Sequence, residues 1–76
     1  GVNLIINYDD QPGALGKIGT LLGAAGANIL AAQLSQDADG EGATIILRLD
    51  RQVPADVQSA IGRDVNAVTL ELVDLS

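Results

Sequence analysis

The fold follows from residues 2–26, VNLIINYDDQPGALGKIGTLLGAAG. Apolar and polar side chains alternate up to Tyr8, which predicts a strand with one buried face. Pro12 ends that strand, because proline fixes φ, suits the first position of a helix and pushes the residue before it out of helical geometry. The apolar residues that follow recur at helical spacing and predict a helix that ends at Gly26. The faces expected to be buried consist of Val2, Leu4, Ile6 and Tyr8 in the strand, and of Leu15, Ile18, Leu21, Leu22 and Ala25 in the helix.

Three glycines, Gly16, Gly19 and Gly23, lie inside this predicted helix. Each costs about 0.5–1 kcal/mol relative to alanine, so we expect a contact that compensates for them. Their spacing leaves a stripe without side chains, where another backbone can approach closely. The contact is ordinary helix–sheet packing, the second helix of the same domain, or a helix of a neighbouring subunit.

The rest of the chain predicts two more strands, a helix and a last strand. Residues 28–36 form a weakly alternating strand, and an acidic turn separates it from a strongly alternating one at 43–49. Val57 and Ile61, one turn apart, indicate a short helix, and residues 66–75 form the final strand, in which Val68, Leu70 and Leu72 share a face.

The resulting order, βαββαβ, predicts a single α+β domain over residues 1–76. Right-handed crossovers place both helices on one face of a four-stranded antiparallel sheet, which is the ferredoxin-like sandwich. No repeat, linker or low-complexity tract interrupts it.

The composition restricts what this domain can do. The net charge of −6 and the presence of one aromatic residue argue against nucleic-acid binding, and the charge also opposes docking on an anionic membrane. Cysteine and histidine are absent, which removes disulfides, thiolate chemistry, the usual general base and the commonest transition-metal ligands. Without an apolar run near the ~20 residues of a membrane span, and without a signal peptide, the chain is expected in the cytoplasm.

The sequence gives little support to catalysis. None of its serines has a histidine to activate it, and Lys17 is the only lysine. Lys17 is followed by Ile18 and not by the serine or threonine of a phosphate-binding loop. Asp9 and Asp10 are the one candidate acid–base pair, but adjacent carboxylates before a helix more often stabilise its N-terminus. We therefore predict no catalytic residue and no cofactor.

A metal site is also not expected. Asp37, Asp39 and Glu41 alternate as calcium ligands do, but the stretch lacks a twelve-residue loop closed by a distant glutamate. Its length fits a solvated turn between two strands, which is the interpretation we favour.

The start of the first helix offers a more promising group of residues. Tyr8 lies at the end of its strand, and Asp10 stands just before a helix whose first N–H groups attract anions. One carboxylate beside free N–H donors suits a zwitterion, and Asn28, at the start of the next strand, can both donate and accept. Alternatively, Asp10 caps the helix, Tyr8 fills the rim of the core, and Asn28 occupies a left-handed turn after Gly26.

These residues resemble the signature of ACT domains, small ferredoxin-like modules that bind amino acids and regulate metabolic enzymes. The resemblance rests on the stretch from Tyr8 to Ile18, YDDQPGALGKI, and on GANI at residues 26–29, and it extends over nearly the whole chain. Within the family, the segments PGALGKIGTLLG (12–23), AAQL (31–34) and LELVDLS (70–76) are most similar to the carboxy-terminal domains of actinobacterial, NAD-dependent phosphoglycerate dehydrogenases.

The resemblance implies a homodimer with L-serine at the junction of two sheets joined edge to edge. It implies that serine contacts Tyr8 and Asp10 of one chain and Asn28 of the other, with backbone groups near Gly13, Ala14 and Leu15. Bound serine would then inhibit the catalytic domains of the parent enzyme, the first of its own biosynthetic pathway. Asn7 departs from the pattern, because a histidine often precedes the tyrosine in such sequences. A dimerisation module that binds no ligand, or a domain specific for another small amino acid, remains an alternative.

Overall fold

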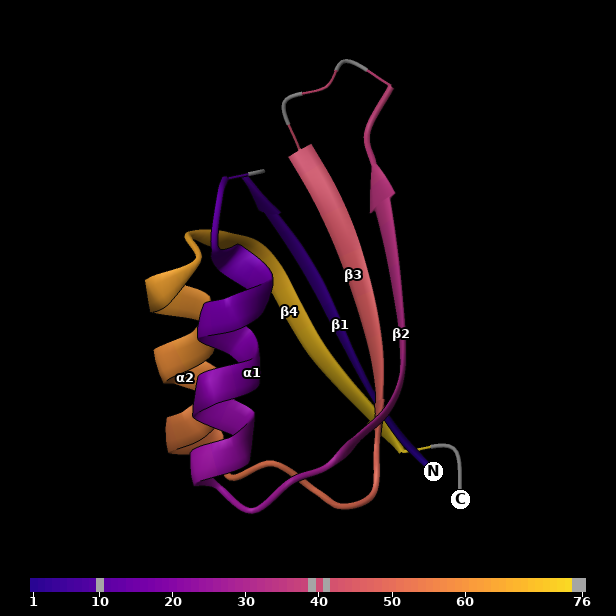
Figure 1. Ribbon diagram of the computed structural model, residues 1–76, viewed down its shortest axis with the longest axis vertical. Coiled ribbons are helices and arrows are strands. Elements are labelled where there is room, and N and C mark those ends of the chain that lie inside the picture. The colour runs from indigo at the N-terminus through magenta and orange to yellow at the C-terminus, as the bar shows by residue number, and fades with distance from the viewer. Residues whose placement is uncertain (10, 39, 41, 75–76) are drawn as a thin grey trace.

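The computed structural model describes residues 1–9, 11–38, 40 and 42–74, and has the predicted element order. The elements are β1 (Val2–Asp9), α1 (Ala14–Ala24), β2 (Ile29–Gln36), β3 (Gly42–Leu49), α2 (Ala55–Asp64) and β4 (Ala67–Asp74). The four strands form one antiparallel sheet in the order β2-β3-β1-β4. Both helices lie side by side on the same face of this sheet (Figure 1). The predicted ferredoxin-like sandwich is therefore confirmed. Five predicted positions, Asp10, Asp39, Glu41, Leu75 and Ser76, lie outside the described residues.

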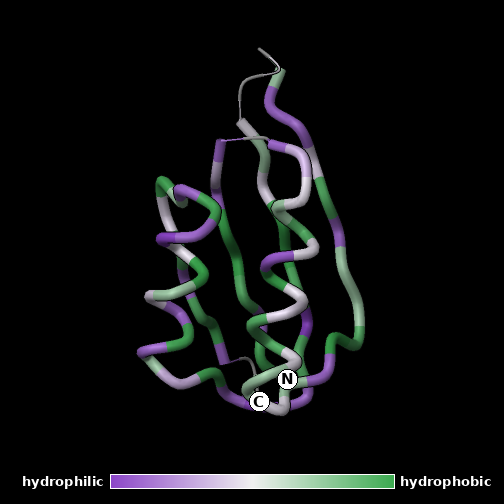
Figure 2. Tube along the Cα trace, turned by 60° about the vertical axis from the view of Figure 1, so that its left-hand side comes forward, coloured by the Kyte–Doolittle hydropathy of each residue, from purple (hydrophilic) through white to green (hydrophobic). Residues whose placement is uncertain are grey.

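The core lies between the helices and the two central strands. In β1 the alternation predicted from the sequence is confirmed, with Val2, Leu4, Ile6 and Tyr8 buried. In β3 every second residue from Ala43 to Leu49 is buried as well. These strands pair along their full length (Ile6 faces Ile45), so their apolar side chains form a continuous surface under the helices. Figure 2 shows long green, hydrophobic stretches in the strands behind the helices.

Helix α1 begins later than expected. Pro12 is not its first residue: it lies in the preceding turn, and Gly13 is the N-cap, with a φ of 83° that favours glycine. At the other end the prediction is confirmed, because Gly26 has a φ of 81° and donates its N–H to the carbonyl oxygen of Gly23 at 3.0 Å. Together with a bond from Ala27 to the carbonyl oxygen of Leu22, this forms a Schellman motif.

One leucine of α1 does not lie on the face that the sequence predicts. The buried row consists of Ala14, Ile18 and Leu22, whereas Leu15 is 47% exposed. Lys17 donates a hydrogen bond from Nζ to the carbonyl oxygen of Asp64 at 3.3 Å, which places its side of α1 next to α2. Leu15 precedes Lys17 by two positions and therefore lies on the opposite flank, which α2 does not cover.

The two edge strands each contain a bulge. In β4 the pairing with β1 shifts between Tyr8–Ala67 and Asn7–Thr69, so that Val68 is the extra residue. The expected alternation therefore fails at Val68, which is 73% exposed, while Leu70 and Leu72 pack against the core as predicted. In β2 the pairing with β3 shifts between Ile29 and Ala31. All eight residues of β2 are exposed.

Among the described residues, none of the helices is long and apolar enough to span a membrane.

Candidate functional site

Tyr8 is buried at the end of β1, where it packs in the core. It is 3% exposed and is paired with Ala43 on one side and Ala67 on the other. Its position also lines a hollow of about 330 Å³ at this end of the sheet, together with Asp9, Asp37 and Thr69. Tyr8 therefore fills the rim of the core and borders the surface at the same time.

The start of α1 lies directly after the turn that follows β1. Gly13, Ala14 and Leu15 form the N-cap and the first two helical positions, and no side chain among the described residues caps them. The first turn also contains no acidic residue. The side chain of Asp9 therefore does not cap the helix, and Asp10, the carboxylate named as the alternative cap, lies outside the described residues. The N–H of Ala14 donates to the carbonyl oxygen of Gln11 at 3.4 Å, whereas the first N–H groups of a helix in general have no intrahelical acceptor and can hold an anion.

Gln11 holds this turn in place, which the sequence did not reveal. Its Nε2 donates to the carbonyl oxygen of Val65 at 2.8 Å, and at 3.4 Å to that of Asp9. The bond joins the turn before α1 to the residue that follows α2. Because the partner lies 54 positions away, no local pattern could have indicated it.

Asn7 points to the face of the sheet that the helices leave open. Its Nδ2 donates to Oγ1 of Thr69 at 2.6 Å, and its Oδ1 accepts a short hydrogen bond from the hydroxyl of Thr44. These bonds link side chains of β4, β1 and β3. The residue that departs from the expected family pattern is therefore engaged with its neighbouring strands.

Asn28 is exposed and bonded to Asp50. Its backbone N donates to Oδ1 of Asp50 at 2.9 Å, and its Nδ2 donates to Oδ2 at 3.0 Å. Arg51 donates to the same carboxylate at 3.1 Å from both Nε and a terminal nitrogen. The bonds from Arg51 and then from Asn28 lower the pKa of Asp50 to about 2. The alternative that Asn28 occupies a left-handed turn is wrong, because the residue with positive φ here is Gly26.

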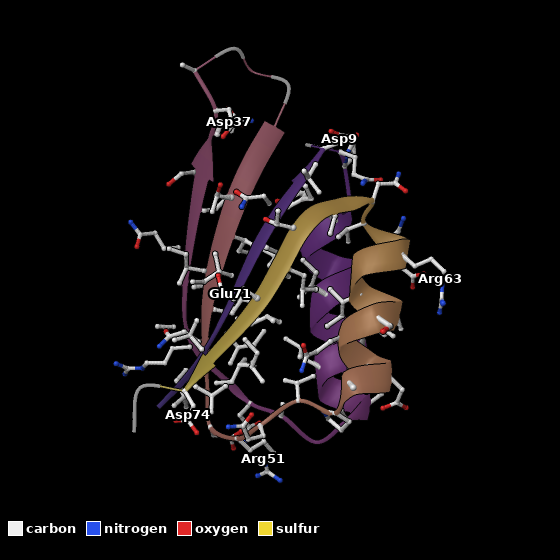
Figure 3. All side chains as sticks on the ribbon, turned by 180° about the vertical axis from the view of Figure 1, so that it is seen from behind. Asp9, Asp37, Arg51, Arg63, Glu71 and Asp74 are labelled. Atoms are coloured by element: carbon white, nitrogen blue, oxygen red, sulfur yellow. The ribbon has the colours of Figure 1, made fainter. Side chains whose placement is uncertain are left out.

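A single chain does not bring Asn28 near Tyr8. Tyr8 pairs with Ala43, whereas Ile29, which follows Asn28, pairs with Leu49 at the other end of β3. At about 3.3 Å per residue, six residues of strand separate the two ends by roughly 20 Å. Figure 3 shows the same separation, with Asp9 at one end of the molecule and Arg51, the neighbour of Asp50, at the other. One small ligand cannot contact both residues of the same chain.

The glycine stripe of α1 has no neighbour within the described chain. A Cβ atom added at Gly16, Gly19 or Gly23 would meet nothing within 4 Å. Helix–sheet packing and contact with α2 are therefore both wrong as explanations of these glycines. Contact with a neighbouring subunit is the explanation that stays a prediction.

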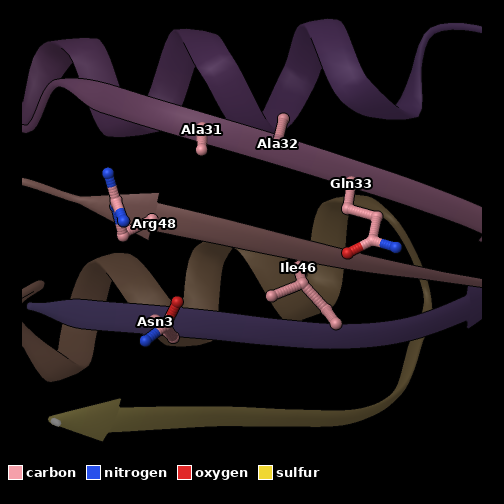
Figure 4. A pocket seen from close by; sticks show the side chains of 6 residues that line it. All are labelled: Asn3, Ala31, Ala32, Gln33, Ile46 and Arg48. Atoms are coloured by element: carbon pink, nitrogen blue, oxygen red, sulfur yellow. The ribbon is translucent and has the colours of Figure 1, made fainter.

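A second hollow lies on the open face of the sheet, over β2, β3 and β1. Figure 4 shows the side chains that line it, which are Asn3, Ala31, Ala32, Gln33, Ile46 and Arg48. It contains none of the residues predicted to bind a ligand. Among the described residues there is also no cluster of acidic side chains that could hold a metal ion.

Comparison with protein families identifies the class of domain to which this fold belongs. The family model of the ACT domain matches residues 2–66. The chain therefore belongs to the ACT domain family, and as such it is a regulatory domain without catalytic function of its own.

The related proteins are dehydrogenases. Over 76 residues the chain is 70% identical to D-3-phosphoglycerate dehydrogenase of Mycobacterium tuberculosis and of Mycobacterium leprae. It is 32% identical over 75 residues to D-3-phosphoglycerate dehydrogenase of Methanocaldococcus jannaschii. The chain spans 14% of the length of each of these relatives.

Solved structures show the same fold at low sequence identity. A formyltetrahydrofolate deformylase from Pseudomonas syringae matches 96% of this chain and 26% of its own, with a TM-score of 0.78 and 15% identity. A second, from Pseudomonas putida, matches 96% of this chain and 28% of its own, with a TM-score of 0.76 and 11% identity. At this identity the similarity concerns the fold alone.

Proposed function

We propose that this chain is the regulatory domain of a D-3-phosphoglycerate dehydrogenase and binds L-serine between two copies of itself. The similarity to such dehydrogenases supports this identification of the parent enzyme. Serine, the end product of the pathway that this enzyme begins, then acts as its feedback inhibitor. We also propose that the domain works in the cytoplasm.

The observation that carries the proposal is the separation of Tyr8 and Asn28 at opposite ends of the chain. Consider a two-fold symmetric dimer with its axis normal to the sheet. The end of each chain that carries Tyr8 then lies beside the end of the partner that carries Asn28. Asn28 of one chain then approaches the turn after Tyr8 of the other. The arrangement creates two equivalent sites, and neither is complete in one chain.

Strand β2 is the edge through which such a dimer would form. An exposed edge strand normally carries charges or proline, which discourage pairing. The eight residues of β2, ILAAQLSQ, include neither, and Leu34 is 53% exposed. The opposite edge, β4, carries Glu71 and Asp74. Pairing β2 with its copy would give one eight-stranded sheet and would cover exposed apolar surface.

The chemistry of the site suits a small amino acid. We assign the ammonium group of the ligand to Asp10 and its carboxylate to the backbone N–H groups near Gly13, Ala14 and Leu15. Tyr8 borders the same end of the sheet, and Asn28 completes the site from the partner chain.

Regulation follows from the shared site. A ligand that contacts both chains binds only the paired arrangement, and therefore stabilises it by its differential affinity. In the complete enzyme this stabilisation would change how the catalytic domains are oriented.

Calorimetric titration of the chain with L-serine, glycine, L-alanine and L-valine tests the proposal. We expect heat of binding with L-serine, weaker binding of the others, and one serine per chain. Tighter binding of another amino acid would replace serine as the ligand. If the chain is dimeric but gives no heat with any of these amino acids, it is a dimerisation module that binds no ligand.

Substituting a glycine of the stripe should have opposite effects on the stability of the single chain and on the strength of the dimer. Gly19→Ala should stabilise the isolated chain by about 0.5–1 kcal/mol, because the added methyl group meets open space and alanine favours the helix. If the partner's backbone packs on the stripe, the same methyl group should weaken the dimer. Thermal unfolding and sedimentation equilibrium measure the two effects.

Gly62→Ala is the matched control in α2. An added Cβ there lies 3.8 Å from Ala67 and 3.9 Å from Leu70, which are ordinary contact distances. It should leave the dimer unchanged. If Gly19→Ala forms a dimer as tight as that of the unmodified chain, the glycine stripe does not lie in the interface.

A further inference from the structure

The amide of Asn28 is held in one orientation by Asp50. The two residues share three hydrogen bonds: two from Asn28 to the Asp50 carboxylate, and one from the backbone N of Asp50 to the carbonyl oxygen of Asn28 at 3.1 Å. The turn before β2 and the turn after β3 are thereby tied together. The side chain of an exposed asparagine is normally free to rotate, but this one is fixed by its partner.

The chemistry of the carboxylate decides which way the amide faces. An ionised carboxylate can only accept hydrogen bonds, so the NH₂ group of Asn28 must face Asp50 and its Oδ1 must face away. Arg51 contacts both carboxylate oxygens at 3.1 Å, which keeps Asp50 charged. Among the described residues, none donates a hydrogen bond to Oδ1 of Asn28. An acceptor is therefore presented at the surface in a fixed direction.

We propose that Asp50 is a positioning residue, which orients Asn28 so that its Oδ1 accepts a hydrogen bond from an amino acid bound in the partner's half of the site. The inference rests on the proposed function and specifies which part of the ligand Asn28 recognises. The donors of L-serine are its ammonium and hydroxyl groups, and its carboxylate would be repelled by Oδ1. Asn28 therefore accepts a hydrogen bond from a donor group of the ligand, and Asp50 fixes the amide in the orientation that this bond requires.

A double-mutant cycle on serine affinity tests whether Asp50 acts through Asn28. Asp50→Asn should weaken L-serine binding about 3- to 10-fold, the equivalent of one net hydrogen bond, because the amide of Asn28 can then rotate. In the Asn28→Ala background, Asp50→Asn should have no further effect. Asp64→Asn makes the same change of charge at an exposed position of α2 and should leave affinity unchanged.

An exchange of the two side chains tests the direction of the hydrogen bond. Asn28→Asp alone places two carboxylates in contact and should abolish binding. Combined with Asp50→Asn, it restores the link, with the amide now donating from position 50, and still presents an acceptor oxygen outward. The double variant should therefore recover most of the affinity. All titrations are made at a temperature at which unfolding measurements show each variant to be folded.

The outcomes separate this inference from the proposed function. If the unmodified chain binds no L-serine, both are wrong. If it binds serine but Asp50→Asn weakens binding equally with and without Asn28, Asp50 has a structural role only and the inference is overturned. If the exchanged variant binds no better than Asn28→Asp, Asn28 does not act as an acceptor.

Discussion

Mixing two variants that each bind serine weakly is expected to restore tight serine binding. Asp10→Ala removes the carboxylate that we propose as the partner of the ligand's ammonium group, and should cost about 1.5–3 kcal/mol of binding. Asn28→Ala should weaken binding from the other side of the interface while the chain stays folded, because Asp50 keeps its bonds to Arg51 and to the backbone of residue 28. When equal amounts exchange subunits, about half of the dimers contain one chain of each kind.

Each mixed dimer has one intact site and one site that lacks both side chains. Roughly a quarter of the original sites should therefore bind L-serine with the original affinity. Calorimetry measures this as the stoichiometry of a high-affinity phase that appears only after subunit exchange. A control mixture of two batches of Asp10→Ala should show no such phase. If the mixture binds no better than its components, all contacts of a ligand come from one chain, and the shared site is wrong.

The fold could be predicted from the sequence because its periodicities are local. The alternation in β1 and β3 determines which side chains are buried, and Gly26 marks the end of α1. Two apolar residues that the sequence predicts in the core are exposed, and in both cases the reason is not local. Leu15 is exposed because α2 lies on the other flank of α1, and Val68 because a bulge in β4 breaks the alternation.

Only part of the candidate site could be predicted from the sequence. Tyr8 and the start of α1 are neighbours in sequence, so their proximity could be expected. The bond between Asn28 and Asp50 could not, because it depends on how two turns 22 residues apart meet at one end of the sheet. The distance between Asn28 and Tyr8 likewise follows from strand register. It is this distance that makes a second chain necessary for the proposed site.

A lysine on strand β2 is expected to separate the dimer and to abolish serine binding with it. Leu34 is 53% exposed in the single chain, so Leu34→Lys should leave the chain folded. In the dimer it would remove a leucine from each side of the interface and bring two positive charges toward each other. Burying a leucine is worth about 1.5–3 kcal/mol. Leu34 is already about half buried in the single chain, so roughly half of this value is lost on each side, which predicts a dissociation constant about 10- to 150-fold higher before the repulsion of the two charges is added.

Val68→Lys provides the matched substitution on the opposite edge. Val68 is 73% exposed in the bulge of β4, so this variant gains the same charge and loses a similarly exposed apolar side chain. Sedimentation velocity over a range of concentrations should find Leu34→Lys monomeric and Val68→Lys dimeric, and titration should show L-serine binding to the second alone. The reverse pattern would move the interface to β4. A dimer that survives both substitutions would mean that the sheets do not join at their edges, and that Asn28 reaches the partner's site by another route.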